Sequence, residues 1–155
     1  MRTGFRVVLS VLVLAALVFT EGCSKDDNGP TAPPPFAYTG TWSGTWNPMF
    51  VTGSAQGFQL TVQSNGSATG SGSATYYNDY GNTVNQSVTM NCTVSSSGSV
   101  SGSGTWNVTI SDVGSGSASG AVTGQLGSSS GSGILRINFD GTDYDITWSV
   151  SKSGL

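Results

Sequence analysis

Beyond Tyr38 the chain alternates apolar and polar residues in a series of short stretches. A period of two sends successive side chains to opposite faces of a β-strand, so each stretch predicts a strand with one buried face. The helical spacing of three and four residues does not occur there, and the frequent Gly and β-branched residues also disfavour helices. The clearest stretches are Phe58–Val62, Val84–Val94, Val100–Ile110, Leu135–Phe139 and Tyr144–Val150.

The last two stretches predict a hairpin around Asp140-Gly141, a dipeptide typical of two-residue turns that match the twist of strands. Such a turn brings every large apolar group of both strands to one face, with Gly133 opposite Trp148. The other face then pairs Arg136 with Asp145, as expected of a solvated surface.

A second turn signal, Asn65-Gly66, allows two registers. A two-residue loop would place Thr69 on the face of Leu60, whereas a three-residue loop with a glycine bulge would align Ala68 and Gly70 with that face. We expect the bulged loop, because it turns small apolar residues rather than hydroxyl groups toward the core.

Four Gly-rich blocks form an internal repeat. Their first glycines lie 30, 32 and 29 residues apart, and each block opens a strand that a second strand follows. Four hairpins predict an all-β domain, a single antiparallel up-and-down β-barrel of about eight strands, because closure removes exposed strand edges. A β-sandwich is the alternative, and a parallel β-helix fits the turn spacing less well. The first glycines are Gly40, Gly70, Gly102 and Gly131.

The first two dozen residues have a different character. Two arginines precede an uncharged apolar run over residues 7–19, an arrangement typical of a secretory signal and too short to cross a bilayer comfortably. With Gly22 directly before Cys23, the segment resembles a bacterial lipoprotein signal, although Thr20-Glu21 stands where that family has an aliphatic and a small residue. The resemblance implies removal of residues 1–22 and acylation of Cys23 with fatty acids such as palmitate. Ordinary signal cleavage and a retained anchor are the alternatives.

The same resemblance implies a place in the bacterial cell envelope, where the covalent lipid on Cys23 makes the membrane a partner. Ser24 matches the enteric sorting rule for export to the outer membrane. Residues 23–37 are charged and then rich in proline, and Pro33–Pro35 favours an extended conformation of about 3.1 Å per residue. We therefore expect a spacer that holds a domain, residues 38–155, up to roughly 40 Å from its anchor.

Composition excludes several classes of function. After Cys23 the chain has three basic residues against seven Asp, so it lacks the clustered cations that nucleic-acid binding requires. It has no His, and no Glu follows Glu21, which removes the commonest general base and metal ligand. We expect no enzymatic activity, no catalytic residue, no metal and no cofactor. If Cys23 carries lipid, Cys92 has no partner for a disulfide and is interpreted as a buried apolar residue.

The densest polar group, formed by Asn138, Asp140, Asp143 and Asp145, could indicate a calcium site or a pair of catalytic carboxylates. The hairpin register explains these residues more simply. Asp140 belongs to the turn, and the others lie on the outer strand face with Asn138 opposite Asp143. Their spacing also differs from that of a calcium loop, so we expect ionised surface residues.

Two loops rich in apolar and aromatic residues, Asn47–Val51 and Tyr76–Gly81, are the candidate functional surface. Successive connections of an up-and-down barrel alternate between its ends, so both loops are expected at the end distal to the spacer. Exposed aromatic residues there would form a ligand mouth or a partner surface, unless the loops fold over the barrel as a plug. The candidate residues are Met49, Phe50, Tyr77 and Tyr80.

The segment Gly40-Thr41-Trp42 looks like the Gly-x-Trp opening of lipocalin-like and avidin-like barrels, which implies a binder of small ligands. The first functional hypothesis is thus an envelope-anchored lipoprotein that holds a small apolar or amphipathic ligand in its lumen. The alternative is a structural or interaction lipoprotein with a filled barrel that contacts another envelope component.

Overall fold

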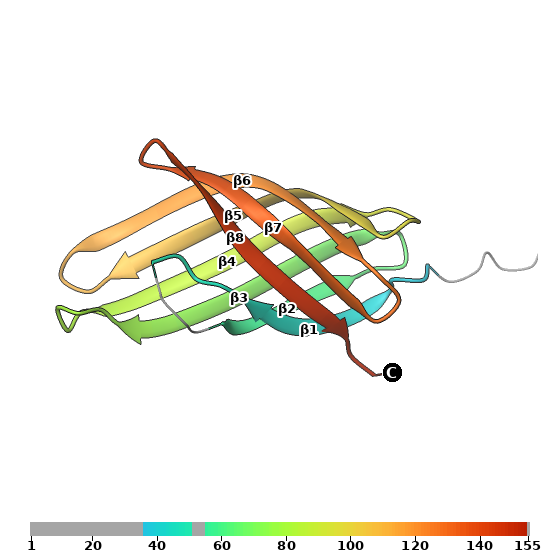
Figure 1. The fold of residues 1–155 in the computed structure, drawn as a ribbon, viewed down its shortest axis with the longest axis horizontal. Coiled ribbons are helices and arrows are strands. Elements are labelled where there is room, and N and C mark those ends of the chain that lie inside the picture. The colour runs from blue at the N-terminus through green and yellow to red at the C-terminus, as the bar shows by residue number, and fades with distance from the viewer. Residues whose placement is uncertain (1–35, 51–54, 155) are drawn as a thin grey trace, which may run out of the picture. The chain divides into compact units, whose positions relative to one another are not determined.

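The described part of the chain forms one closed β-barrel. The computed structural model describes residues 36–50 and 55–154, and eight antiparallel strands follow one another around the barrel in chain order (Figure 1). The predicted all-β, up-and-down architecture is therefore confirmed. The expected signal, Cys23 and the spacer up to residue 35 lie outside the described residues. The strands are β1 (Gly40–Trp46), β2 (Gln56–Val62), β3 (Ser67–Tyr77), β4 (Thr83–Val94), β5 (Ser99–Ile110), β6 (Gly114–Leu126), β7 (Ser130–Phe139) and β8 (Thr142–Lys152).

The β7–β8 hairpin has the predicted register. Asp140 and Gly141 have φ angles of 52° and 76°, and two central residues with positive φ are what a type I′ turn requires. Gly133 consequently lies opposite Trp148, as the sequence predicts. The first and last strands, β1 and β8, also pair with each other and close the barrel.

The β2–β3 connection has the predicted glycine bulge. The backbone N–H of Gln63 donates to the carbonyl of Ser67 at 2.8 Å, and Gly66, with φ of 83°, occupies the last loop position. This loop sets Ala68 opposite Val62, so the small residues of β3 face the core. The β3–β4 and β4–β5 loops close in the same way, each with a positive-φ glycine in the last position.

Large rings fill the space that inward-facing glycines leave in the barrel. A Cβ atom added to Gly133 would lie 2.4 Å from Cζ2 of Trp148, and one added to Gly72 would lie 2.7 Å from the indole of Trp46. Phe58 meets Trp148 with ring centroids 6.0 Å apart. Small and large residues on neighbouring strands therefore interlock, as a small barrel requires. The largest fully buried side chains include Trp42, Trp46, Trp106, Leu60, Met90, Leu126, Leu135, Ile137 and Ile146.

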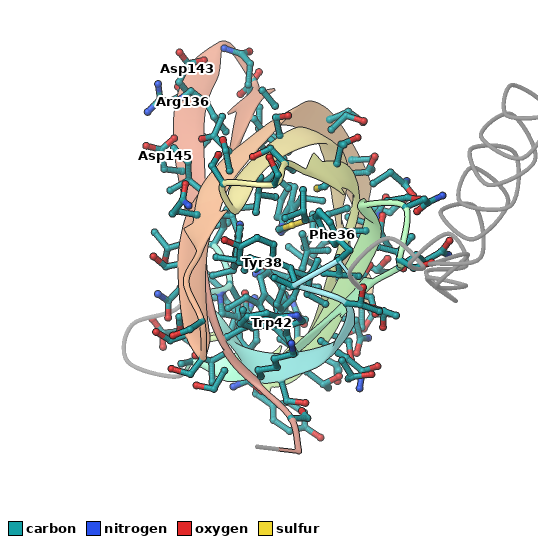
Figure 2. All side chains as sticks on the ribbon, turned by 90° about the vertical axis from the view of Figure 1, so that its right-hand side faces the viewer. Phe36, Tyr38, Trp42, Arg136, Asp143 and Asp145 are labelled. Atoms are coloured by element: carbon teal, nitrogen blue, oxygen red, sulfur yellow. The ribbon has the colours of Figure 1, made fainter. Side chains whose placement is uncertain are left out.

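Aromatic residues cover the end at which the chain enters the barrel, here called the proximal end. The indole N–H of the buried Trp42 donates to the carbonyl of Tyr38 at 2.9 Å. Phe36 and Tyr38 meet edge to face with ring centroids 5.6 Å apart and pack against the core, as Figure 2 shows. Lys152 donates to the carbonyl of Ala37 at 2.9 Å and lies 5.7 Å from the ring centroid of Trp42. Phe36 and Ala37, which were expected to belong to the spacer, thus contribute to this end of the barrel.

The strands β3 to β6 extend farther than their neighbours at the opposite, distal end. The pairing of β2 with β3 runs no farther in this direction than Gly72, although β3 continues to Tyr77. The pairing of β6 with β7 starts at Gly120, although β6 begins at Gly114. The tips of the β3–β4 and β5–β6 hairpins therefore project beyond the closed part of the barrel (Figure 1).

Candidate functional site at the distal end

Four connections meet at the distal end: β1–β2, β3–β4, β5–β6 and β7–β8. The structure therefore brings the candidate residues Met49, Phe50, Tyr77 and Tyr80 to the same end of the barrel, although they come from two loops. Their environments differ, however. Met49 is buried, whereas the other three have exposed side chains.

The described first part of the β1–β2 loop, residues 47–50, packs at the distal opening, where Gln86 of β4 holds the backbone of Met49. Val51, which the sequence-based prediction includes in this loop, lies outside the described residues. The backbone N–H of Met49 donates to Oε1 of Gln86 at 3.1 Å, and Nε2 of Gln86 donates to the carbonyl of Met49 at 2.6 Å. The same amide accepts from the indole N–H of Trp106 at 2.8 Å and donates to the hydroxyl of Tyr76 at 2.5 Å. Both acceptor sites and both donor hydrogens of this amide are used. Met49 is thus part of a plug with a fixed backbone.

Gln86 is not among the residues of this site that the sequence predicts. It stands at an inward position of the alternating stretch Val84–Val94 and is 2 % exposed. A polar residue at an inward position must find hydrogen-bond partners inside the protein. A Gln at an inward position of an alternating stretch is therefore the sequence signal that could have identified this residue. Its main partner, the backbone of Met49, lies 37 residues earlier in the chain, and no local pattern links the two.

Phe50 points out of the plug. Its φ of 60° lies in the left-handed region, which a bulky residue rarely adopts, and its side chain is 65 % exposed. The ring nevertheless meets Tyr144 and Trp106 edge to face, with centroid separations of 5.5 Å and 6.2 Å. Phe50 is therefore an exposed aromatic residue that rests on a supporting layer of buried and half-buried rings.

The two projecting hairpins present further exposed apolar side chains. Oδ1 of Asn78 accepts from the backbone N–H groups of Tyr80 at 3.0 Å and Asn82 at 2.9 Å, which fixes the β3–β4 loop. The β5–β6 hairpin lies beside it, since Ser111 donates its backbone N–H to the carbonyl of Thr83 at 2.9 Å. The exposed residues are Tyr77 (76 %), Tyr80 (89 %) and Val113 (69 %).

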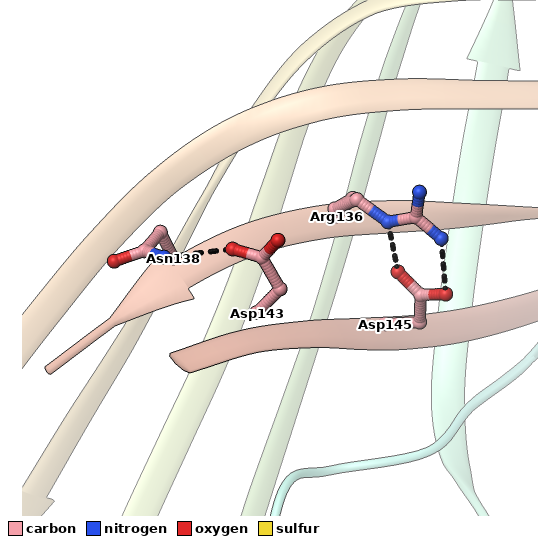
Figure 3. Close-up of polar contacts among 4 residues, drawn as sticks. All are labelled: Arg136, Asn138, Asp143 and Asp145. Atoms are coloured by element: carbon pink, nitrogen blue, oxygen red, sulfur yellow. Dashed lines mark hydrogen bonds and ion pairs between the residues drawn. The ribbon is translucent and has the colours of Figure 1, made fainter. Parts of the chain in front are cut away.

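The polar group on the β7–β8 hairpin has the predicted outward orientation. Arg136 donates from Nε and Nη2 to the two carboxylate oxygens of Asp145, both at 2.7 Å, and Asn138 donates to Asp143 at 2.7 Å (Figure 3). The hydrogen bond from Arg136 and its charge lower the pKa of the Asp145 carboxyl, and the reciprocal interaction raises the pKa of Arg136. Among residues 36–50 and 55–154, no group of three or more His, Cys, Asp and Glu could hold a metal ion.

Cys92 has the predicted buried position. Burial raises the pKa of its thiol to about 11, so the thiol stays protonated at neutral pH. A protonated thiol is a poor nucleophile. Cys92 therefore has the properties of a packing residue.

An open hollow of about 640 Å³ lies on the outer wall over β1 to β4, where Gly57 has no side chain. Its exposed lining consists of hydroxyl and amide groups, without a charged or an exposed aromatic side chain. Binding sites for small molecules are usually apolar with a few convergent polar groups. The distal end, which combines exposed rings with a fixed backbone, is the stronger candidate.

Comparisons of the chain with protein-family models, with curated proteins and with solved structures found no match. The described residues contain no helix long and apolar enough to cross a membrane. The function is therefore inferred from the geometry of the distal end.

Proposed function

We propose that this protein is a lipid-anchored lipoprotein of the bacterial envelope, whose packed barrel is a rigid support for an interaction surface at its distal end. One observation carries the proposal. Interior glycines such as Gly72, Gly124 and Gly133 face large rings that occupy their space, whereas Phe50, Tyr77 and Tyr80 are exposed at one end. Of the two functions derived from the sequence, this geometry favours the interaction lipoprotein.

A ligand in the lumen would compete with the protein's own side chains. Gly72, Gly124 and Gly133 could have left room for a ligand, but Trp46 or Trp148 lies within 2.7 Å of a Cβ atom built on each of them. The distal opening is filled as well, since Gln86 fixes the backbone of the plug. Admission of a ligand would require these contacts to be broken.

The exposed rings, by contrast, are ready for contact without such a change. Large exposed aromatic side chains are enriched at protein interfaces, and a fixed backbone lowers the entropy lost on binding. The positive φ of Phe50 adds to this argument, because backbone conformations of this kind concentrate at binding and active sites. The spacer expected over residues 23–37 would hold this surface away from the membrane.

The anchor is tested by mass analysis of the mature N-terminus. We expect the mature chain to start at Cys23, with two acyl chains on the sulfur-linked glyceryl group. A Cys23→Ala variant should lose the lipid and leave the membrane fraction or remain unprocessed. An unmodified terminus at another residue would contradict the anchor but would leave the interaction surface open to its own test.

A second candidate, a small apolar or amphipathic ligand in the lumen, is favoured by one observation. The indole N–H groups of Trp46 and Trp148 are buried without a hydrogen-bond partner among the described residues. Burying such a donor without a partner costs about 1 to 3 kcal/mol. A polar group of a ligand could remove that cost if the barrel opened.

Site-specific photo-crosslinking in intact cells distinguishes the two candidates. A photoreactive residue is introduced at Tyr80 in the distal loop and, as a matched control, at the exposed Ser97 in a proximal loop. The interaction function predicts a discrete cross-linked product from position 80 and none from position 97. Equal products from both positions, or no product from either, would refute it. A small molecule that co-purifies in native mass spectrometry would support the second candidate instead.

A further inference from the structure

The carboxylates of the distal end are not neutralised. Asp79 lies in the β3–β4 loop, Asp112 in the β5–β6 loop, and Asp140 and Asp143 at the β7–β8 tip. All four are exposed. The hairpin tips of the distal end thus share one sign of charge.

The described cations do not offset this charge. The ion pair found among the described residues joins Arg136 to Asp145, so this Arg is already matched. Lys152, the other described cation, belongs to the proximal end, where it donates to the carbonyl of Ala37. Asp143 is also close enough to Arg136 to raise the pKa of the guanidinium, but one positive charge cannot offset both Asp143 and Asp145, so the distal end keeps a net negative charge.

Two of these carboxylates lie next to an exposed apolar or aromatic residue. Asp79 precedes Tyr80 and Asp112 precedes Val113, and all four of these side chains are exposed. The two projecting hairpins consequently place negative charges beside exposed apolar side chains. The four distal carboxylates are distributed over three separate hairpins.

We infer that the distal surface binds a cationic segment of a partner protein, one that presents several Lys or Arg side chains. This inference rests on the proposed function and specifies the chemistry of the partner. Lys and Arg can lay their aliphatic stems over Tyr80 and Val113 while their charged heads reach Asp79 and Asp112. A cation over an aromatic face is also attracted electrostatically by the ring.

The same charges disfavour the other occupants of such a surface. An anionic lipid headgroup or an acidic polysaccharide would be repelled by the four carboxylates. A neutral apolar segment would gain from the rings but would have to desolvate the carboxylates without compensation. The cationic segment makes use of both features.

The probe for this inference is a synthetic peptide of repeated Gly-Lys-Leu units, compared with peptides that carry Gln or Glu in place of Lys. Binding to the mature protein is followed by changes in backbone amide NMR shifts. We expect the Lys peptide alone to shift the distal loops around Tyr80 and Val113, and to leave the proximal loop around Ser97 unchanged. Raising the salt from about 0.01 M to about 1 M shortens the Debye length from about 30 Å to about 3 Å and should abolish the shifts.

A pair of charge variants provides the matched comparison. Asp79→Asn/Asp112→Asn removes two distal charges, whereas Asp26→Asn/Asp27→Asn removes the same number of charges from the expected spacer. Asn tolerates the positive φ of Asp112, so the first variant should fold. We expect the distal variant to weaken binding of the Lys peptide about three- to tenfold, because two exposed and therefore weak charge pairs are lost, and the spacer variant to leave it unchanged.

The outcomes also separate this inference from the proposed function. Equal binding of the Lys and Glu peptides, or equal effects of the two double variants, would overturn the cationic partner. If a partner cross-links to position 80 and its binding is insensitive to salt and to the distal variant, the interaction surface stands and the cationic partner is refuted. If neither peptide nor partner contacts the distal end, both fail.

Discussion

Replacing Trp148 with Ala tests the packing on which the barrel depends. Trp148 is 3 % exposed, and its indole occupies the space above two glycines on adjacent strands. Cβ atoms at Gly124 and Gly133 would lie 2.6 Å and 2.4 Å from its Cζ2 atom. The ring also contacts Phe58 at a centroid distance of 6.0 Å.

Trp→Ala in a core typically costs about 3 to 5 kcal/mol. Two features of this site modify that value in opposite directions. Glycines on the neighbouring strands have no side chains that could move into the cavity, which favours the upper half of the range. The lost indole N–H is a buried donor without a partner among the described residues, so its removal recovers part of the cost. We therefore expect the free energy of unfolding to fall by about 3 to 4 kcal/mol, a large share of the roughly 5 to 15 kcal/mol of a domain.

Urea unfolding followed by far-UV circular dichroism measures this change. With an m-value of about 2 kcal/mol per M, the midpoint should fall by about 2 M. The control is Thr147→Ala on the outer face of the same strand, which loses one exposed hydrogen bond from Asn47 and should cost less than about 1 kcal/mol.

If Trp148→Ala does not fold, Trp148→Phe keeps most of the packing and should show less than half of the effect. Similar small changes at positions 147 and 148 would refute the assignment of the two faces.

Three further predictions follow from other parts of the structure. Gln86→Leu should lower the free energy of unfolding by about 2 kcal/mol or more, because the backbone of Met49 loses its hydrogen bonds to this side chain. Hydrogen exchange at the amide of Met49 should also become faster, whereas the control Asn85→Ala on the outer face should show neither effect. In a Cys23→Ser background, Cys92 should react with a thiol reagent at pH 8 only after denaturation, and rapid labelling of the native protein would contradict its burial. The free energy of unfolding should decline between about pH 9 and about pH 11, because the thiol ionises at lower pH in the unfolded chain than in the folded one. An NMR titration of Arg136→Gln should show that the pKa of Asp145 rises toward its ordinary value. In the unsubstituted protein, any stabilisation by this pair should be present at neutral pH and disappear as the pH falls through the depressed pKa.

Local patterns sufficed for the strands and for several turns. The alternation from Leu135 to Val150 and the Asp140-Gly141 dipeptide define a hairpin whose pairing depends on nearby residues alone, and that register is confirmed. The bulged β2–β3 loop was predicted because the two possible registers differ in which residues of β3 face the core. Closure into a barrel followed from the number of strands and from the cost of exposed edges.

The burial of Met49 at the distal end did not follow from the sequence. The exposure of Tyr77 and Tyr80 agrees with their places at the end of β3 and in the turn that follows, but the burial of Met49 depends on Gln86, which is distant in the chain. The interior is a similar case. Alternating Gly and Trp could leave either a lumen or a filled core, and only the direction of each ring decides between them.

The sequence by itself determined the class of fold, the strand faces and the sign of the charge, because these properties depend on residue types and a period of two. It also carried the signal-like segment that motivates the anchor at Cys23. Only the tertiary structure decided which rings fill the space above which glycines, which loop plugs the barrel and which aromatic residues remain exposed. These outcomes depend on the stagger between strands as the sheet closes, which brings together residues such as Met49 and Gln86 that no local interaction connects.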